Sequence, residues 1–230
     1  MVVQHNLTAM NANRQLSGVT SAQAKSTEKL SSGYRINRAA DDAAGLSISE
    51  KLRSQIRGLD KAASNSQDGI SLVQVAEGAL NETHSILQRM NELATQAAND
   101  TNTSTDRASI QKEMDQLTSE IDRIRSTTQF NSMNLLDGSF TGKELQVGAL
   151  SGQKISISIG NMNSSKLKIS GLKVSSFSSA GKAMTAIQKA INSVSSERSK
   201  LGALQNRLEH TINNLNTTSE NTSAAESRIR

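Results

Sequence analysis

The sequence predicts a mainly α protein, an elongated antiparallel bundle of long helices with a small β-hairpin region at one end. The 230 residues include no proline, and a proline inside a helix would kink or break it. They include three Phe, one Tyr and no Trp, so the apolar residues are those that suit narrow helix–helix contacts. These residues recur at spacings of three and four along most of the chain, and alternate with polar residues in only one segment.

The first expected helix covers residues 6–31 and has few apolar residues. They are Leu7, Met10, Leu16, Val19 and Leu30. Small and polar residues fill most of the remaining positions, and an isolated helix of this composition is marginally stable in water. We therefore expect this segment to be helical only when a partner helix covers its thin apolar stripe, and poorly ordered in the free monomer.

The second expected helix covers residues 45–99, and its apolar spacing is that of a helical bundle. The contact positions are Val73, Ala76, Leu80, Thr83, Leu87, Met90, Ala94 and Ala97. Glycine in a helix costs roughly 1 kcal/mol relative to alanine, so a break or kink is expected near Gly58 or Gly69. The turn-forming residues 99–106 end the helix.

The third expected helix covers residues 105–129 and has the most regular pattern. Its stripe is Ile110, Met114, Leu117, Ile121 and Ile124, with spacings of four, three, four and three. Thr105 is a suitable N-cap, and Asp106 would place a negative charge in the first turn.

The pattern changes between residues 130 and 178. Residues 134–138 have the composition of a turn, and Ile155, Ile157 and Ile159 alternate with serine as in a half-buried strand. Further apolar residues predict one or two more short strands, namely Leu167, Ile169, Leu172 and Val174. Glycines at intervals favour hairpins.

A last long helix is expected from residue 179 to 230, with a polar sequence after Leu215. It must return along the earlier helices to bury its own stripe. We therefore expect four parts. They are an N-terminal inner-core helix (1–32), a connector (33–45), long helices with a small β region (46–178), and a returning C-terminal helix of the same domain (179–230).

The composition gives little support for nucleic acid or membrane partners. The net charge of +5 comes from 26 basic and 21 acidic residues without a basic block or interleaved aromatic residues, so we expect no nucleic acid partner. No apolar run is long enough to cross a membrane, so no membrane insertion is expected. The first residues lack the features of a cleaved signal peptide, so export would need another route.

We find no arrangement of residues that predicts catalysis. The histidines are His5, His84 and His210, and none belongs to a known metal-binding spacing. There is no cysteine, no phosphate-binding glycine loop and no nucleophile motif. We expect no enzyme activity and no catalytic, cofactor-binding or metal-binding residues.

Five long motifs resemble bacterial flagellin and together span nearly the whole chain. They are VVQHNLTAMNANRQL, LSSGYRINRAADDAAGLSISEKLRSQIRGL, NSQDGISLVQVAEGALNETHSILQRMNELATQAAND, TQFNSMNLLDG and LGALQNRLEHTINNLNTTSENTSAAESRIR. The resemblance implies a secreted, extracellular structural subunit of the flagellar filament that polymerises with other flagellin subunits for motility. It also implies the flagellar export apparatus and a flagellin chaperone or assembly factor as partners.

The short segment between the two conserved ends suggests a minimal flagellin without large variable outer domains. Family members continue beyond the position of Arg230 into a further terminal helix, which we expect to be lacking here. The alternative is a flagellar junction or cap-like coiled-coil binding protein, because such relatives share the terminal patterns.

The resemblance also implies roles for two sets of residues. Arg35, Arg38, Asp41 and Asp42 lie in the family's connector and would form pairs within or between subunits. The alternative is a solvated linker with ordinary surface ions.

The second set would contact Toll-like receptor 5. Its members are Gln88, Arg89, Leu93, Gln96, Ile110 and Glu113. Arg89 and Leu93 are four residues apart and share one helix face, whereas Asn91 stands where strong activators commonly carry arginine. The alternative is that Arg89 and Glu113 form an ordinary exposed pair between helices.

Overall fold

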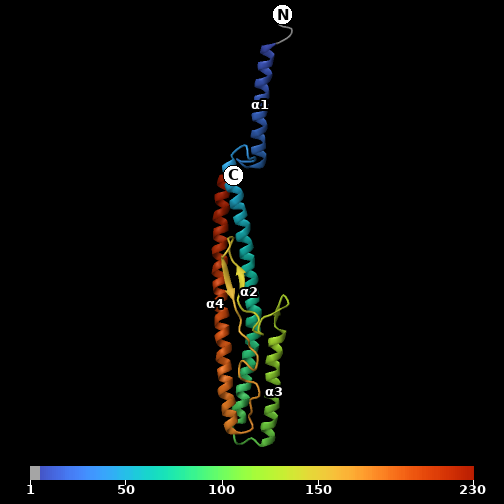
Figure 1. Ribbon diagram of the computed structural model, residues 1–230, viewed down its shortest axis with the longest axis vertical. Helices are drawn as coiled ribbons and strands as arrows, with labels where there is room; N and C mark the ends of the chain where they lie inside the picture. Colours follow the sequence, from blue (N-terminus) through green and yellow to red (C-terminus); the bar gives the residue numbers. More distant parts are fainter. Residues whose placement is uncertain (1–5) are drawn as a thin grey trace. The chain divides into compact units, whose positions relative to one another are not determined.

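The computed structural model describes residues 6–230, so His5 and the other residues before position 6 of the segment considered for a signal peptide lie outside the described residues. It confirms the mainly helical fold class. The helices are α1 (Leu7–Ser32), α2 (Ala43–Ala97), α3 (Ser104–Thr127) and α4 (Phe177–Ile229), and four short strands lie between α3 and α4 (Figure 1). The chain forms two compact units, one of residues up to Leu59 with Thr217–Arg230 and one of Asp60–Asn216. The predicted four-part division stays a prediction.

Helix α1 is bounded by two caps that the local sequence explains. The side chain of Asn6 accepts a hydrogen bond from the backbone N–H of Ala9 at 3.1 Å. At the other end Gly33 adopts a left-handed conformation with φ of 71°, and its N–H donates to the carbonyl of Lys29. None of residues 7–32, all of which the structure describes, is buried. The helix therefore has no buried apolar contact within this monomer.

Helix α2 is continuous, so the expected break near Gly58 or Gly69 is wrong, while the alternative of a kink there stays a prediction. One glycine costs only about 1 kcal/mol, whereas α2 contributes a long row of fully buried residues to the core of the second unit, including Leu80, Leu87 and Ala94. This packing is sufficient to keep the helix intact.

The N-cap of α3 lies two residues before the predicted one. Thr103, and not Thr105, is the N-cap, and it forms a capping box with Asp106. The side chain of Thr103 accepts a bond from the N–H of Asp106, and the carboxylate of Asp106 accepts one from the N–H of Thr103 at 2.9 Å. A capping box needs the acidic residue three positions after the cap, and this spacing selects Thr103.

Two short antiparallel hairpins follow α3. Strand β1 (Gln129–Phe130) pairs with β2 (Met133–Asn134), and β3 (Lys143–Gln146) pairs with β4 (Lys154–Ile157). Ile155 and Ile157 are buried, which confirms the predicted alternation for this strand, and Ile159 is buried just beyond its end.

The strands predicted around Leu167–Val174 are absent from the described structure, and this segment is irregular. Its apolar side chains are nevertheless buried among the helices. The backbone is bonded through local turns and through side chains of three helical residues. The carboxylate of Asp122 accepts bonds from the N–H and the hydroxyl of Ser164. The side-chain amide of Gln111 donates to the carbonyl of Leu172 and accepts from the N–H of Val174. The carboxylate of Glu197 accepts a bond from the N–H of Gly160. Alternating apolar residues here mark contacts with helices and not a sheet.

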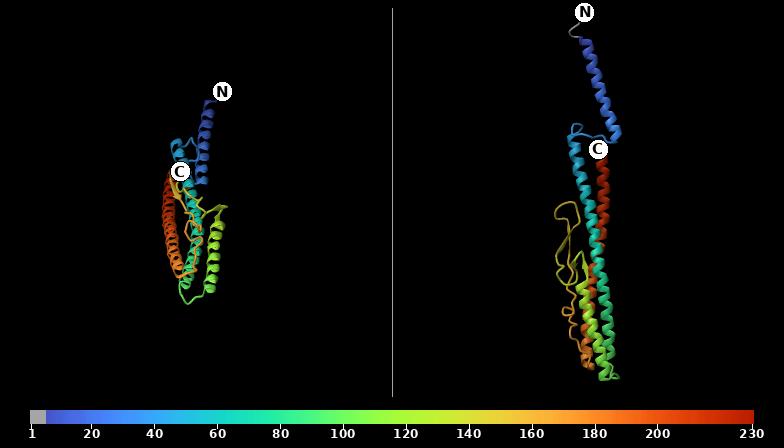
Figure 2. Two further views of the ribbon diagram at one scale, coloured as in Figure 1. Left: turned by 60° about the horizontal axis from the view of Figure 1, so that its bottom comes forward. Right: turned by 90° about the vertical axis from the view of Figure 1, so that its right-hand side faces the viewer.

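In the second unit, α4 runs antiparallel to α2, while α3 and the segment before α4 complete the core (Figures 1 and 2). An ion pair of 3.7 Å joins Arg198 of α4 to Glu77 of α2. The predicted return of the last helix along the earlier ones is confirmed in this unit. Among residues 6–230, no helix is both long and apolar enough to span a bilayer.

Candidate interaction surfaces

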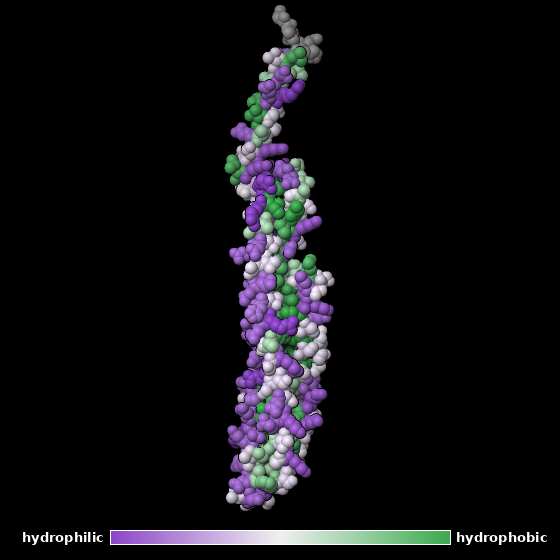
Figure 3. All heavy atoms as spheres, turned by 90° about the vertical axis from the view of Figure 1, so that its left-hand side faces the viewer, coloured by the Kyte–Doolittle hydropathy of each residue, from purple (hydrophilic) through white to green (hydrophobic). Residues whose placement is uncertain are grey.

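The first candidate surface is an exposed apolar row on α1. Ala9, Ala12, Leu16 and Val19 follow spacings of three, four and three, which places them on one helix face. The side chains of Leu16 and Val19 are 66% and 63% exposed. Figure 3 shows hydrophobic side chains exposed at several points along α1. We call these four residues the α1 row. Its spacing is that of a helix–helix contact, and no element of the described monomer covers it.

The second candidate surface is the predicted connector, in which the two arginines bind different partners. The guanidinium of Arg35 donates to the carbonyl of Ile229 at 2.8 Å, and the guanidinium of Arg38 pairs with Glu28 of α1 at 2.9 Å. The Arg38 side chain is 73% exposed, so its ion pair contributes little to stability.

The two aspartates of the connector organise its backbone. Asp41 accepts bonds from the N–H groups of Asn37 and Arg38, both at 3.2 Å, and these bonds lower the pKa of the Asp41 carboxyl. The side chain of Asp42 accepts a bond from the N–H of Gly45 at 2.8 Å, in the first turn of α2.

No ion pair joins an arginine to an aspartate of this set within the described monomer, so pairs between subunits stay a prediction. Sequence reasoning missed Glu28, which pairs with Arg38 of the connector, and Glu226, which contacts α2 just beyond the connector. Glu226 of α4 accepts a bond from Ser49 of α2 at 2.7 Å and pairs with Arg53 at 3.4 Å. These contacts join residues about 175 positions apart, and helical spacing within one segment carries no signal for them.

The third candidate surface lies on α2 and α3 in the second unit and centres on Arg89. Its guanidinium pairs with Glu113 of α3 at 3.0 Å and with Glu92 of its own helix at 3.2 Å. The hydrogen bond to Glu113 is the main cause that raises the pKa of Arg89 above its ordinary value. The side chains of Arg89 and Glu113 are about half exposed, so this charged pair is accessible to a partner.

The other predicted receptor contacts divide into exposed and buried residues. Gln88 and Gln96 are exposed, and the Gln88 amide lies 3.1 Å from the ring Nε2 of His84. Leu93 and Ile110 are only 2% and 7% exposed and belong to the core. The structure therefore presents four of the six as a polar surface, with the two apolar residues packed in the core.

A polar groove of about 690 Å³ adjoins this surface and includes residues that sequence reasoning did not select. Besides Gln96 it is lined by Asn91, Glu92, Thr95, Asn99 and Asn102. Glu92 could have been found from the sequence, because it is three residues after Arg89 on one helix. Asn102 could not, because it reaches the carbonyl of Gln96 through the irregular turn between α2 and α3.

The described residues 6–230 contain no group of three or more His, Asp or Glu side chains placed to hold a metal ion. His84 is half-buried, with its Nε2 beside Gln88.

Comparison with known families gives two matches. Residues 3–141 match the bacterial flagellin N-terminal helical region, and residues 184–230 match the bacterial flagellin C-terminal helical region. Together the two matched regions include all three candidate surfaces.

Curated relatives align over the whole chain. It is 54% identical to a flagellin of Halalkalibacterium halodurans and 50% identical to a flagellin of Bacillus subtilis. Each alignment covers 100% of this chain, with 85% of the first relative and 87% of the second.

Solved structures share the fold. A Bacillus cereus flagellin matches with a TM-score of 0.60 and 34% identity over 71% of this chain and 94% of its own. A protein from Vibrio parahaemolyticus, assigned to the flagellar hook-associated class, matches with a TM-score of 0.68 over 82% of this chain and 99% of its own. Its identity is only 14%, so this match shows the fold alone.

Proposed function

Because this chain belongs to the bacterial flagellin family, we propose that it polymerises with copies of itself through the α1 row and the connector to build the flagellar filament. Flagellins are structural proteins of the bacterial flagellum, located outside the cell, and the chain is not an enzyme.

The observation that carries this proposal is the uncovered α1 row. A helix with apolar residues at spacings of three and four is stabilised mainly when another helix buries them, since propensity alone is weak. Within the described monomer nothing buries this face. Contacts that run from one copy to the next without closing a ring generate an open helical filament.

Filament formation can be tested by expressing the gene that encodes this chain in a flagellin-deficient bacterium. We expect electron microscopy to show filaments and motility assays to show swimming. Secreted protein without filaments would contradict the proposed assembly.

The α1 row has a matched test within the same helix. Leu16→Gln introduces a polar amide at the centre of the row and should abolish filaments. Ser21→Gln introduces the same side chain on the opposite face of α1 and should leave filaments intact. Residue 21 is five residues after residue 16, which at 3.6 residues per turn places it about 140° around the helix from Leu16. Equal filament numbers from both variants would exclude the row as an assembly contact.

We further propose that the exposed polar residues around Arg89 bind Toll-like receptor 5. The support is that Arg89 is half exposed, is held by two ion pairs and lies beside a groove lined by polar residues. Arginines are enriched among the residues that dominate protein interfaces. Leu93 and Ile110, which belong to the core, would act by keeping α2 and α3 together.

A receptor reporter assay tests this role. Arg89→Ala should raise the concentration needed for half-maximal response about tenfold or more, as expected for an interface arginine. Arg123→Ala removes an exposed arginine that pairs with Glu120 on α3, outside the predicted contact set, and should leave the response unchanged. Equal responses from all three proteins would remove Arg89 from the binding site.

We also propose that the chain is a compact flagellin that uses the flagellar export apparatus and a flagellin chaperone or assembly factor. Only residues 142–183 separate the two family regions, and they form the β3–β4 hairpin, the segment leading to α4 and the first residues of α4. A junction or cap-like role is the alternative and rests on fold alone. If the chain is a junction or cap protein, its expression in the flagellin-deficient bacterium should produce no long filaments.

A further inference from the structure

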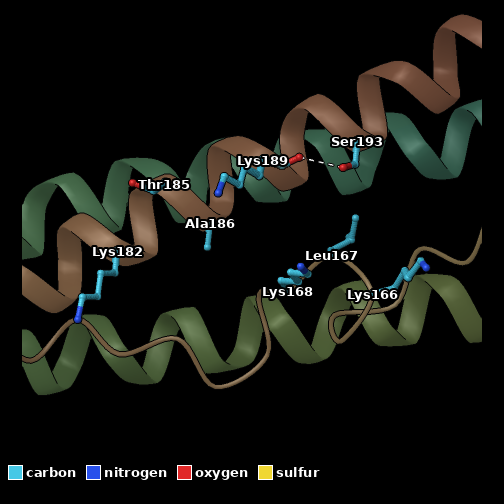
Figure 4. A pocket seen from close by; sticks show the side chains of 8 residues that line it. All are labelled: Lys166, Leu167, Lys168, Lys182, Thr185, Ala186, Lys189 and Ser193. Carbon is cyan, nitrogen blue, oxygen red and sulfur yellow. Dashed lines mark hydrogen bonds between the residues drawn. The ribbon is translucent and has the colours of Figure 1, made fainter.

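A basic groove lies in the second unit between α4 and the irregular segment that precedes it. It has a volume of about 440 Å³. Lys182 and Lys189 extend from α4, and Lys166 and Lys168 lie on the segment opposite them (Figure 4). Thr185 and Ser193 add two hydroxyl groups, and no carboxylate is among the described residues that line the groove.

The four lysines carry positive charge that the chain does not neutralise. Within residues 6–230 none of them forms an ion pair. By contrast, Lys200, farther along α4, pairs with Glu197 at 3.0 Å. Several like charges on the walls of one groove attract anions more strongly than isolated surface charges do.

The walls that carry these lysines are held in place. Lys182 and Lys189 are seven residues apart on one face of α4, which separates their backbones by about 10.5 Å. On the opposite wall, the N–H of Lys166 donates to the side chain of Asn163 at 2.6 Å. Lys168 adopts a left-handed backbone conformation with φ of 58°, and its N–H donates to the carbonyl of Ser165.

The remaining lining is suited to a sugar chain. Leu167 is largely buried and Ala186 half-buried, and they provide a small apolar surface against which sugar C–H groups can pack. The hydroxyls of Thr185 and Ser193 donate to backbone carbonyls, so their oxygens can accept bonds from sugar hydroxyls. A second hollow of about 490 Å³ shares Lys166, Leu167 and Ser193 with the first. It is also lined by Lys200 and Glu197, which pair with each other at 3.0 Å, so the positive charge is concentrated in the first groove.

We propose that this groove binds an acidic polysaccharide outside the cell, through ammonium contacts to its sulfate or carboxylate groups. The extracellular location of flagellin puts such polymers within reach. Single-stranded nucleic acid binding usually relies on aromatic side chains that stack on bases, and no aromatic residue lines either hollow. The groove lies outside the α1 row, the connector and the surface around Arg89, so the proposal is independent of the functions above.

Binding can be measured with the whole chain and immobilised heparin as the sulfated probe. We expect binding that weakens as salt is raised, because exposed charges are screened. The double variant Lys182→Gln/Lys189→Gln should bind about tenfold or more weakly, since each basic side chain at an anionic surface adds a severalfold gain in affinity. Glutamine has a helix propensity close to that of lysine, so α4 should persist, which circular dichroism checks.

The matched control is Lys61→Gln/Lys112→Gln, which removes two exposed helical lysines of the same unit outside the groove. It should bind heparin within about twofold of the wild type. Equal losses in the two double variants would overturn the proposal, because binding would then follow net charge alone.

Other probes identify the chemistry of the ligand. Hyaluronate carries carboxylates only, so the tighter binder of heparin and hyaluronate shows which anion the lysines prefer. Neutral dextran should not bind, and its binding would overturn the role of charge. DNA of equal charge density that binds as tightly as heparin would overturn the preference for a sugar chain.

Discussion

The N-terminus of α3 depends on the side chains of Thr103 and Asp106, each of which bonds the other's backbone N–H. Thr103→Ala should lower the free energy of unfolding by about 1 kcal/mol, because it leaves a helix N–H without its partner. Chemical denaturation measures this change. Thr105→Ala is the control at the residue that the sequence pattern favours, and it should have the smaller effect. A larger loss from Thr105→Ala would place the cap at residue 105 after all.

The same cap makes part of the stability pH-dependent. Hydrogen bonds from the hydroxyl and the N–H of Thr103 lower the pKa of Asp106 below its ordinary value of 3.8. When the pKa of a carboxyl is lower in the folded than in the unfolded protein, the carboxyl stabilises the fold, and this contribution is complete above the unfolded-state pKa. The contribution is lost as the pH falls through the folded-state pKa. The difference in melting temperature between wild type and Asp106→Asn should therefore shrink below pH 3.8. A difference that stays constant down to about pH 2 would contradict this role.

At the scale of elements, α2 contains glycines with opposite surroundings. A methyl group added at Gly78 would meet nothing within 4 Å, whereas one added at Gly69 would collide with the side chain of Leu145 in β3. Gly69 therefore allows the hairpin to approach the helix closely, and this contact gives a glycine inside α2 a structural purpose.

The two glycines should respond differently to alanine. Gly78→Ala should raise the free energy of unfolding by about 0.5–1 kcal/mol, because alanine loses less backbone entropy in a helix. Gly69→Ala should gain less or lose stability, since Leu145 must move. Thermal unfolding of the two variants side by side provides the measurement. A larger gain at Gly69 would show that the hairpin does not need the close approach.

At the scale of the whole chain, α1 and the helices of the second unit should differ in local stability. Residues 7–32 bury no side chain in the described structure, whereas α2, α3 and α4 share an extensive core. Local opening is easiest where few apolar contacts hold a segment. Hydrogen exchange of the monomer should show fast exchange in α1 and slow exchange around Leu87. Strong protection between Leu7 and Leu30 would contradict this expectation.

The sequence could predict those parts of the fold whose signal is local. The spacing of Ile110, Met114 and Ile121 identified α3 and its buried face, and the alternation of Ile155 and Ile157 identified a strand. The irregular segment before α4 could not be predicted in this way. Its alternating apolar residues pack on helices, and its backbone is bonded to side chains far away in the sequence.

The candidate surfaces show the same division. The family resemblance selected Arg89, and helical spacing put it on one face with Leu93. This reasoning could not separate Gln96, which is exposed, from Leu93, which is buried against other helices. In the connector, the charges predicted pairs within or between subunits but did not identify the partner groups. Within the described chain, Arg38 pairs with Glu28 and Asp41 accepts bonds from backbone N–H groups.

The irregular segment before α4 is fastened at a few points by Gln111, Asp122 and Glu197, all of which lie on helices. Selection for folding therefore acts on those three helical residues and on the buried apolar side chains of the segment. Exposed positions outside the proposed groove, such as Ser165 and Ser170, carry neither of these constraints. Substitutions at such positions can therefore change the outer surface of this stretch while its architecture stays constant.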